Sequence, residues 1–411
     1  MNYWINQYIA TPEMPGGTRH YDLAMQLKEL GVPMTLVGAD LNLSTRGYGA
    51  RENASDRRPI HRNYGGVPFV WLFTPSYTRN DWRRYWSMVR FSVAVFLYLL
   101  RAPIQPSSVF IGSSPHLLAA LAGALAAKLR RVRFVLEVRD LWPESLVEIQ
   151  GRESAVSHIL RRIAYYLYRR ARYVIILAEG NRRAVARAGV RDEQFLYVPN
   201  GVDPHAFTDA AQTEATNSTA KKLRAVYTGA HGAANDLDTL IDAAAYLTQK
   251  GRDDIEIVLL GDGPEKPHLV RMAAAAGLTN VVFLAPIPKG EIPRFLHSAA
   301  VGVLVLRDVP LFRYGVSPNK LFDYMAAGLP IVTNVAGECT DIVNQANCGI
   351  GVPPGDPVAL AEGLQQLADA EDRTTLGVRG RDYVFTHFNR RLLAERLLPI
   401  FSSTATPAKD R

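Results

Sequence analysis

The chain has 411 residues, of which 48% are hydrophobic and 21% are charged. This composition excludes an intrinsically disordered protein, and at roughly 150 residues per domain it predicts two or three domains. The net charge is +8, but residues 1–205 hold 27 Lys and Arg against 16 Asp and Glu, whereas the remainder holds 20 against 23. The two cysteines exclude a disulfide framework and fit a reducing compartment. The start of the chain predicts no signal peptide, and no apolar run reaches the roughly 20 residues of a spanning helix.

In chain order, the first half alternates short apolar runs with amphipathic stretches. The predicted strands are Tyr3–Ile9, Met34–Val37, Phe69–Phe73, Val109–Ile111, Phe134–Val138, Tyr173–Ile176 and Phe195–Val198. Helical spacing predicts helices over Thr18–Leu30 and Leu117–Leu129. This alternation indicates βαβ units and a mostly parallel sheet.

A polar segment, Asp209–Lys222, is predicted to be a linker, and the same rhythm restarts after it. The second half has predicted strands Leu223–Tyr227, Ile255–Leu260, Val281–Phe283, Val301–Leu306 and Ile331–Thr333, and predicted helices Leu237–Leu247, Glu265–Ala276 and Lys320–Ala327. The fold class is therefore α/β, with Rossmann-like domains over residues 1–205 and 206–382. Residues 383–411 are expected to pack back towards the first domain. Within them, Tyr383–Ile400 is the predicted C-terminal helix, and the residues after it are expected to form a frayed tail.

Glycine turns follow three of the predicted strands. They contain Gly16 and Gly17, then Gly229 and Gly232, then Gly261. A glycine turn before a helix lets the backbone approach a phosphate, although an ordinary turn between strand and helix fits almost as well. In the second turn, His231 is expected to be a solvated loop residue. The Asp236–Asp238 pair is better explained by helix capping than by metal binding.

The stretch from Ser317 to Pro330 carries the most chemical information. Its loop precedes a helix, so the backbone N–H groups of Ser317, Asn319 and Leu321 could hold a phosphate, and Lys320 adds a positive charge. Asp323, expected in the first turn, could accept hydrogen bonds from the vicinal hydroxyls of a ribose. The alternative is a capped helix with an acidic first turn.

Two further features lie in the basic first half. Arg139, Asp140 and Glu144 follow a predicted strand and suit a site for an acceptor, although an ion pair from Arg139 to either carboxylate is also expected. The segment Asp81–Arg101 has helical apolar spacing, with Trp82 and Trp86 beside Arg83 and Arg84. We interpret it as a helix at an anionic membrane surface, with a core helix as the alternative.

Together these residues resemble the retaining glycosyltransferases of family 4, which have the GT-B fold of two Rossmann-like domains facing across a cleft. The resemblance is strongest over Ser317–Pro330, and it extends to Asn6–Tyr8, Gly16–Tyr21, Val138–Glu144 and Pro199–Asp203. More narrowly, the chain resembles the bacterial surface-polysaccharide branch that includes N-acetyl-L-fucosamine transferases.

The resemblance implies a nucleotide-sugar donor, most simply a UDP-sugar, and a lipid-linked or growing glycan acceptor. Asp323 would bind the ribose, Lys320 and the loop would hold the diphosphate, and Gly16 and Gly17 would close over it, with no cofactor or metal. Arg19, His20 and Arg139 would lie on the acceptor side, and Asp140 or Glu144 would handle the acceptor hydroxyl. The location implied is the cytoplasmic face of the plasma membrane. The first glutamate of the family's E-x7-E motif is replaced by Gly315.

Two other functions fit the same fold. The missing glutamate at Gly315 favours a non-catalytic scaffold or glycan-binding subunit. A weaker alternative within the same fold is a UDP-sugar epimerase or hydrolase. A nucleic-acid partner is not expected, because no recognised binding module is present. The sequence does not specify the sugar, the nucleotide base, the acceptor or the oligomeric state.

Overall fold

We describe the protein from a computed structural model covering residues 1–14, 16–41, 47–51, 55–77, 82–207 and 222–402. The predicted linker Asp209–Lys222 lies almost entirely outside these ranges, as does Asp81. The chain forms two compact units, the first of residues 1–199 and 390–411 and the second of Asn200–Asn389. The structure divides the chain after Pro199 and after Asn389, whereas the sequence predicted boundaries after residues 205 and 382. The last segment of the chain groups with unit 1.

Unit 1 is built on an eight-stranded sheet in the order β3-β4-β2-β1-β5-β6-β7-β8. Its strands are β1 (Asn2–Ile5), β2 (Met34–Ala39), β3 (Ile60–Tyr64), β4 (Val67–Leu72), β5 (Val109–Ser113), β6 (Arg133–Val138), β7 (Val174–Ile176) and β8 (Phe195–Tyr197). All neighbours are parallel except β3 and β4. The edge strand β3 was not predicted, because its residues are mostly exposed and lack an apolar run.

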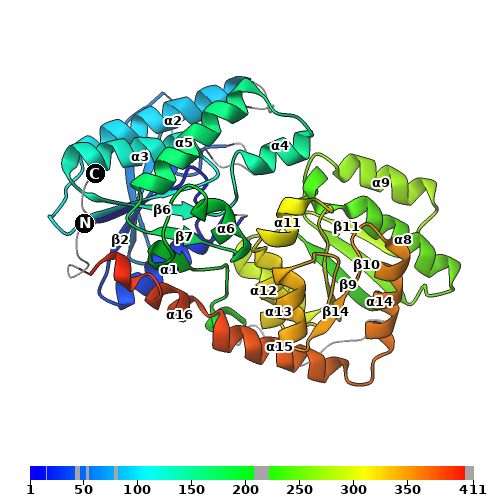
Figure 1. The fold of residues 1–411 in the computed structure, drawn as a ribbon. Coiled ribbons are helices and arrows are strands. Elements are labelled where there is room, and N and C mark those ends of the chain that lie inside the picture. The colour runs from blue at the N-terminus through cyan, green and yellow to red at the C-terminus, as the bar shows by residue number, and fades with distance from the viewer. Residues whose placement is uncertain (15, 42–46, 52–54, 78–81, 208–221, 403–411) are drawn as a thin grey trace. The chain divides into compact units, whose positions relative to one another are not determined.

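The helices of unit 1 are α1 (Arg19–Glu29), α2 (Trp82–Arg101), α3 (Leu117–Arg130), α4 (Glu144–Gln150), α5 (Ala155–Arg170), α6 (Gly180–Ala186) and α16 (Arg390–Glu395), with short 3-10 turns η1 (Asp192–Gln194) and η4 (Leu398–Ile400). Helices α2, α3 and α5 lie side by side along one face of the sheet, while α1 packs against α16 (Figure 1). The core beneath α1 and α16 joins Trp4, Leu36 and Ile111 to Leu393 and Leu397.

Unit 2 has a six-stranded parallel sheet in the order β11-β10-β9-β12-β13-β14. Its strands are β9 (Leu223–Thr228), β10 (Ile255–Leu260), β11 (Val281–Leu284), β12 (Val301–Leu304), β13 (Ile331–Thr333) and β14 (Gly349–Gly351). Its helices are α8 (Leu237–Gln249), α9 (Lys266–Ala275), α10 (Ile292–His297), α11 (Pro310–Tyr314), α12 (Asn319–Ala326), α13 (Glu338–Gln345), α14 (Pro357–Asp369) and α15 (Arg373–His387), with 3-10 turns η2 (Ala233–Asn235) and η3 (Lys289–Glu291). Helices α8, α9 and α14 cover one face, and α12, α13 and α15 cover the other.

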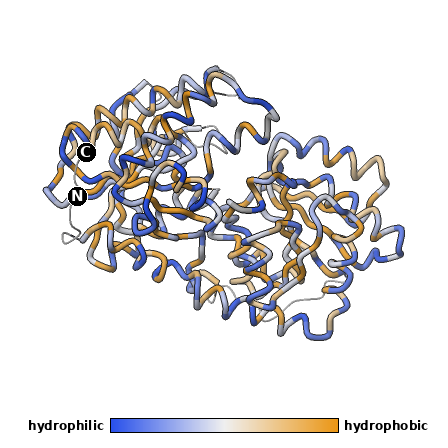
Figure 2. The backbone as a smooth tube through the Cα atoms, viewed as in Figure 1, coloured by the Kyte–Doolittle hydropathy of each residue, from blue (hydrophilic) through white to orange (hydrophobic). Residues whose placement is uncertain are grey.

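Hydrophobic residues concentrate along the strands and on the inner sides of the helices in each unit (Figure 2). Two predicted elements end earlier than their apolar residues suggest. Strand β1 stops at Ile5, because Asn6 accepts a hydrogen bond from the backbone N–H of Tyr8 and turns the chain. The predicted helix Tyr383–Ile400 is broken after His387, where the Asn389 side chain donates to the carbonyl of Phe385. In the part of the chain that the structure describes, no helix is long and apolar enough to span a membrane.

Candidate functional site

Two glycine loops follow β9 and β10 and pack directly on each other. The backbone N–H of His231 donates to the carbonyl of Asp262 at 2.8 Å. A Cβ atom on Gly261 would collide with the carbonyl of Gly229, and one on Gly263 would collide with that of His231. Both Gly229 and Gly261 have positive φ, at 145° and 151°. Gly261 is thus a buried packing residue rather than a group presented to a ligand, whereas Gly229 is exposed.

His231 lies at the centre of these loops and is fully buried, so the expectation of a solvated histidine was wrong. The glycines on either side let the chain fold around its ring. Burial, reinforced by the Lys266 cation, lowers the pKa of His231 to about 4, so its imidazole is neutral at pH 7. Neither ring nitrogen has a hydrogen-bond partner among the described residues.

Lys320 projects from the start of α12 towards the first glycine loop. Its Nζ lies 3.8 Å from the centroid of the Tyr227 ring and 3.4 Å from Oδ1 of Asn235. It forms no ion pair with any described residue, and burial lowers its pKa to about 7. A half-buried cation without a carboxylate partner favours an anionic ligand, because a bound anion would restore the charged ammonium.

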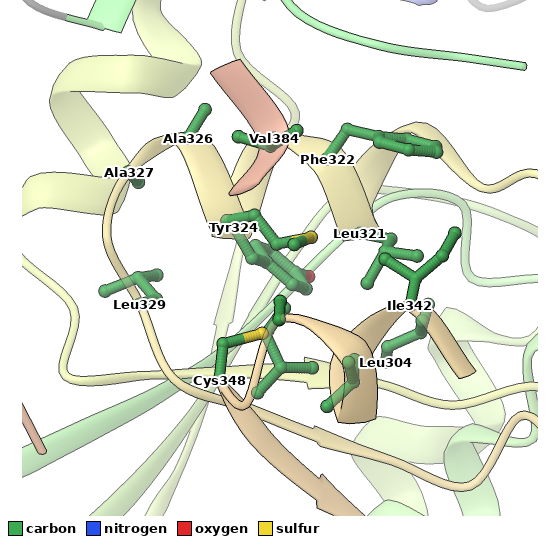
Figure 3. Close-up of a cluster of buried hydrophobic side chains, with 14 of the residues drawn as sticks. Leu304, Leu321, Phe322, Tyr324, Ala326, Ala327, Leu329, Ile342, Cys348 and Val384 are labelled. Atoms are coloured by element: carbon green, nitrogen blue, oxygen red, sulfur yellow. The ribbon is translucent and has the colours of Figure 1, made fainter. Parts of the chain in front are cut away.

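Helix α12 is fixed firmly enough to aim this lysine. Leu321, Phe322 and Tyr324 are buried and pack with Leu304, Ile342 and Val384 (Figure 3). The hydroxyl of Tyr324 accepts a hydrogen bond of 2.8 Å from the backbone N–H of Thr228, at the end of β9. The helix is therefore tied to the strand from which the first glycine loop emerges.

The loop before α12 is held from the start of unit 2. Asn200 donates its backbone N–H to Oγ of Ser317 at 3.0 Å and its side-chain amide to the Ser317 carbonyl at 2.5 Å. Asn319 is the first helical residue, one position before the predicted start at Lys320. The prediction for Leu321 was wrong, because its N–H already donates to the Pro318 carbonyl at 3.2 Å and its side chain is in the core.

Asp323 lies in the second turn of α12, not in the first as predicted, because the helix begins at Asn319. It is 7% exposed, and its Oδ2 pairs with Nζ of Lys289 at 2.5 Å. The other oxygen, Oδ1, has no partner among the described residues, so it can still accept from a ligand hydroxyl.

In unit 1, Gly16 and Gly17 are exposed just before α1. Arg19 and His20 are not exposed: they are 1% and 2% accessible, and both bind Glu137 at 2.9 Å. Arg19 also donates to the carbonyls of Pro199 and Val198. The prediction that these two side chains meet the acceptor or a membrane was therefore wrong, because their donors hold the interior of unit 1 together.

The three residues predicted to form one site after β6, namely Arg139, Asp140 and Glu144, do not share a common set of partners. Glu144 pairs with Arg161 at 3.0 Å, not with Arg139 as one alternative expected. Asp140 reaches solvent just beyond β6, and its backbone N–H and that of Arg139 both donate to Oγ of Ser114. Crowding by surrounding protein atoms raises the pKa of Asp140, and the adjacent Arg139 cation partly offsets this rise.

Helix α2 presents two different faces. Ser87, Phe91, Val95 and Leu99 are buried, so the helix is partly a core helix. The opposite face exposes Trp82, Tyr85, Trp86, Val89, Val93 and Leu97, of which Trp82 is 68% accessible. Arg83 is exposed with this face, whereas Arg84 is half-buried. Burial raises the pKa of Tyr8, and the nearby Arg84 cation offsets part of this rise. Burial lowers the pKa of His116, and the same cation adds to that fall.

Comparison with known proteins agrees with both units. The model of the glycosyl transferase 4-like domain matches residues 16–201, and that of glycosyl transferases group 1 matches residues 222–370. The chain is a glycosyltransferase of the group 1 type. It is 24% identical to the probable glycosyltransferase WbjE of Pseudomonas aeruginosa over 64% of this chain and 66% of that protein. It is 30% identical to the D-inositol 3-phosphate glycosyltransferase of Salinispora tropica over 42% of this chain and 37% of that protein.

The fold is GT-B, as expected. The structure of Anabaena Alr3699/HepE in complex with UDP and glucose superposes with a TM-score of 0.70 at 17% identity, covering 98% of this chain and 99% of that one. The segments matched in the two curated relatives span about a third to two thirds of their lengths.

Two features of the glycosyltransferase were missed or misread in its sequence. Lys289, the partner of Asp323, stands alone in a Pro-Lys-Gly loop and gave no signal of its own. Asp236 is the N-cap residue of α8, but its side chain makes no capping bond to the backbone and instead accepts from Asn334. Asp238 lies in the first turn, as expected for an acidic residue that stabilises the helix dipole, 3.5 Å from His268. Within the described ranges, no group of three or more His, Cys, Asp or Glu is placed to hold a metal ion.

Proposed function

We propose that this glycosyltransferase moves a sugar from a UDP-sugar, with retention of configuration, to a lipid-linked or growing surface-polysaccharide acceptor. The observation that carries the donor assignment is Lys320, a cation without an ion-pair partner among the described residues, beside two interlocked glycine loops. Alr3699/HepE, which shares this fold, was crystallised with UDP and glucose. The narrower resemblance to fucosamine transferases favours an N-acetylated amino sugar.

In this proposal the diphosphate is bound by Lys320 and by the backbone N–H groups of Ser317 and Asn319. The ribose hydroxyls donate to Oδ1 of Asp323, while Lys289 holds Oδ2 and so fixes the orientation of the carboxylate. No carboxylate is available at Gly315, so the sugar itself must be bound by other groups.

The chemical step then needs charge stabilisation of the leaving group. The bond between the anomeric carbon and the diphosphate oxygen breaks as the acceptor oxygen bonds to the same face of that carbon. The acceptor proton passes to the departing phosphate, and the charge on the diphosphate is balanced by Lys320 and the backbone donors. Asp140 would orient the acceptor hydroxyl. Glu144 is the weaker candidate, because it is already paired with Arg161.

The first test is a screen of nucleotide sugars. UDP and one or more UDP-sugars should raise the melting temperature, because a ligand at 100 times its Kd adds about 2.7 kcal/mol of stability. The active donor should release UDP when a lipid-linked glycan is supplied, which separates transfer from hydrolysis or epimerisation without acceptor. If no nucleotide or nucleotide sugar binds, the proposal is wrong.

The same assay tests whether Asp323 binds the ribose. The wild-type enzyme should bind UDP more tightly than 2′-deoxy-UDP, and Asp323→Ala should lose about tenfold in UDP affinity and most of this discrimination. Glu291→Ala, two residues from Lys289, should leave both affinities unchanged. Equal preference for the two nucleotides in the wild-type enzyme would show that Asp323 does not bind the ribose.

We also propose that α2 places the enzyme on an anionic membrane. The exposed side chains of α2 combine aromatic residues with arginine, and further exposed apolar residues lie on the neighbouring helices α3 and α5, namely Leu125, Leu129, Val156, Ile159 and Tyr165. Exposed patches of this kind mark interaction surfaces, and each basic residue near an anionic surface adds about 1 kcal/mol.

Co-sedimentation with phosphatidylglycerol vesicles tests this surface. Replacing Trp82, Arg83 and Trp86 by Ser, Gln and Ser should reduce vesicle binding at least about tenfold, because both the apolar contact and one charge are lost. Val270→Ser, which removes an exposed apolar residue of unit 2, is the control. Undiminished binding by the triple variant would mean that α2 is not the membrane surface.

A further inference from the structure

Buried polar atoms without partners gather at one end of unit 1. Among the described residues, side-chain atoms of this kind occur in the loops after β1, β4 and β5 and on the buried face of α2: Gln7 Oε1, Thr11 Oγ1, Thr74 Oγ1, Ser87 Oγ and His116 Nδ1. Native proteins satisfy nearly all buried polar groups, so each such atom calls for an explanation. These loops leave the carboxyl ends of parallel strands, where open α/β folds bind ligands.

His116 is the best defined member of this cluster. It follows β5, it is 1% exposed, and its Nε2 lies 3.4 Å from Oγ of Ser92 on α2. Burial, with the Arg84 cation, lowers the pKa of His116 to about 3, so its ring is neutral and one nitrogen can donate to an acceptor. The ring has no described partner for that second nitrogen.

Arg84 supplies the charge. It shares one face of α2 with Ser87 and Phe91, which are both buried, and its field acts on Tyr8 and His116 together. Its neighbour Arg83 lies about 100° away around the helix, on the side of Trp86 and Arg90, and is exposed. The Tyr8 hydroxyl is itself buried, whereas Arg84 is half-buried and joins the buried atoms to solvent.

We propose that Tyr8, Arg84, Ser87 and His116 bind a phosphate or diphosphate group of the acceptor. The guanidinium matches the geometry of phosphate oxygens, and the hydroxyl and imidazole groups supply neutral donors that an anion would satisfy. This inference rests on the proposed function, since it identifies the acceptor as an anionic, phosphate-linked molecule. It also gives α2 two roles, because the face opposite Arg84 carries the exposed aromatic residues.

The test measures binding of decyl diphosphate by calorimetry in the presence of saturating UDP, so that the loops around Lys320 are already occupied. Arg84→Gln and His116→Ala should each weaken binding about tenfold or more, because each removes a hydrogen bond to a charged group. Arg84→Lys should recover part of the affinity, and Arg62→Gln, which changes an exposed arginine of β3, should bind as the wild type does. Unchanged UDP affinity and melting temperature show that each variant is folded.

Competition between ligands shows which part of decyl diphosphate the site binds. Inorganic pyrophosphate and decyl diphosphate that compete for one site identify the phosphate groups as the ligand, whereas binding of decanol with equal affinity would overturn the proposal. Equal decyl diphosphate affinity in Arg84→Gln and wild type would also overturn it. Because UDP binding is measured on the same samples, a failure confined to decyl diphosphate leaves the proposed donor and activity standing.

Discussion

Replacing Lys320 by alanine should lower kcat/KM for sugar transfer by about 10²–10³-fold, which is the effect of removing one preorganised group that stabilises developing charge. The lysine is the only side-chain cation that we assign to the diphosphate. Its ammonium lies 3.8 Å from the Tyr227 ring, on a helix whose apolar side chains pack in the core of unit 2. Lys250→Ala is the matched control, because that lysine also sits over a tyrosine, Tyr246, in the same unit.

The same lysine predicts a pH dependence of nucleotide binding. With its pKa lowered to about 7 in the unliganded protein, Lys320 loses its proton as the pH rises above 7, and a bound diphosphate must then recover that proton. The affinity for UDP should therefore fall between pH 7 and pH 9, by up to about tenfold per pH unit, and Lys320→Met should be nearly flat over this window. Parallel pH profiles for the two proteins would contradict the assignment.

Folding stability gives an independent measurement of the same shift. Because the folded-state pKa of Lys320 lies below that of an unfolded lysine, the unfolded chain binds more protons between about pH 7 and pH 10. The lysine therefore destabilises the unliganded protein most below pH 7, and its contribution to stability rises with pH through this window. Lys320→Met should be more stable than the wild type at pH 6.5 even though its transfer activity should be lower.

Replacing Glu137 by alanine should destabilise unit 1 by about 3–5 kcal/mol, the range for breaking a buried ion pair. Glu137 is fully buried and accepts from Arg19, His20 and Ser113, so its loss would leave Arg19 as an uncompensated internal cation. Tryptophan fluorescence measures this unit specifically, because all five tryptophans lie within its residues. Glu193→Ala, which removes an exposed pair with Arg191, should change stability by less than about 0.5 kcal/mol.

The acid side of the stability profile should report the same network. Burial alone would raise the pKa of Glu137, but His20 and Arg19 lower it well below its ordinary value. Its stabilising contribution is thus complete above the unfolded pKa, near pH 4.3, and is lost as the pH falls through the folded value. Glu137→Gln should flatten the profile below about pH 4, whereas an unchanged acid limb would mean that another carboxylate controls acid unfolding. Adding Arg19→Met to Glu137→Ala should restore part of the stability, because the isolated cation is removed.

The sequence was enough to predict the fold and the position of the loops that we propose bind the donor. Buried parallel strands such as Ile255–Leu260 and Ile331–Thr333 are continuous apolar runs, so their limits could be predicted to the residue. The glycine turns and the loop before α12 were also visible, because a turn from strand to helix requires local backbone conformations that few residues adopt. Apolar runs and turns depend on residues that are close together in the sequence, so a local pattern is enough to predict them.

Which polar side chains are available to a ligand could be seen only once the chain was folded. Arg19 and His20 looked like surface groups until Glu137, more than a hundred residues away, was seen to bind both. His231 is buried because a second glycine loop closes over it, and Arg83 and Arg84 differ because one helix face meets Tyr8 and His116 while the other meets solvent. Burial and pairing depend on contacts between distant segments, and these contacts, rather than residue type, set whether a charge is free to bind a ligand.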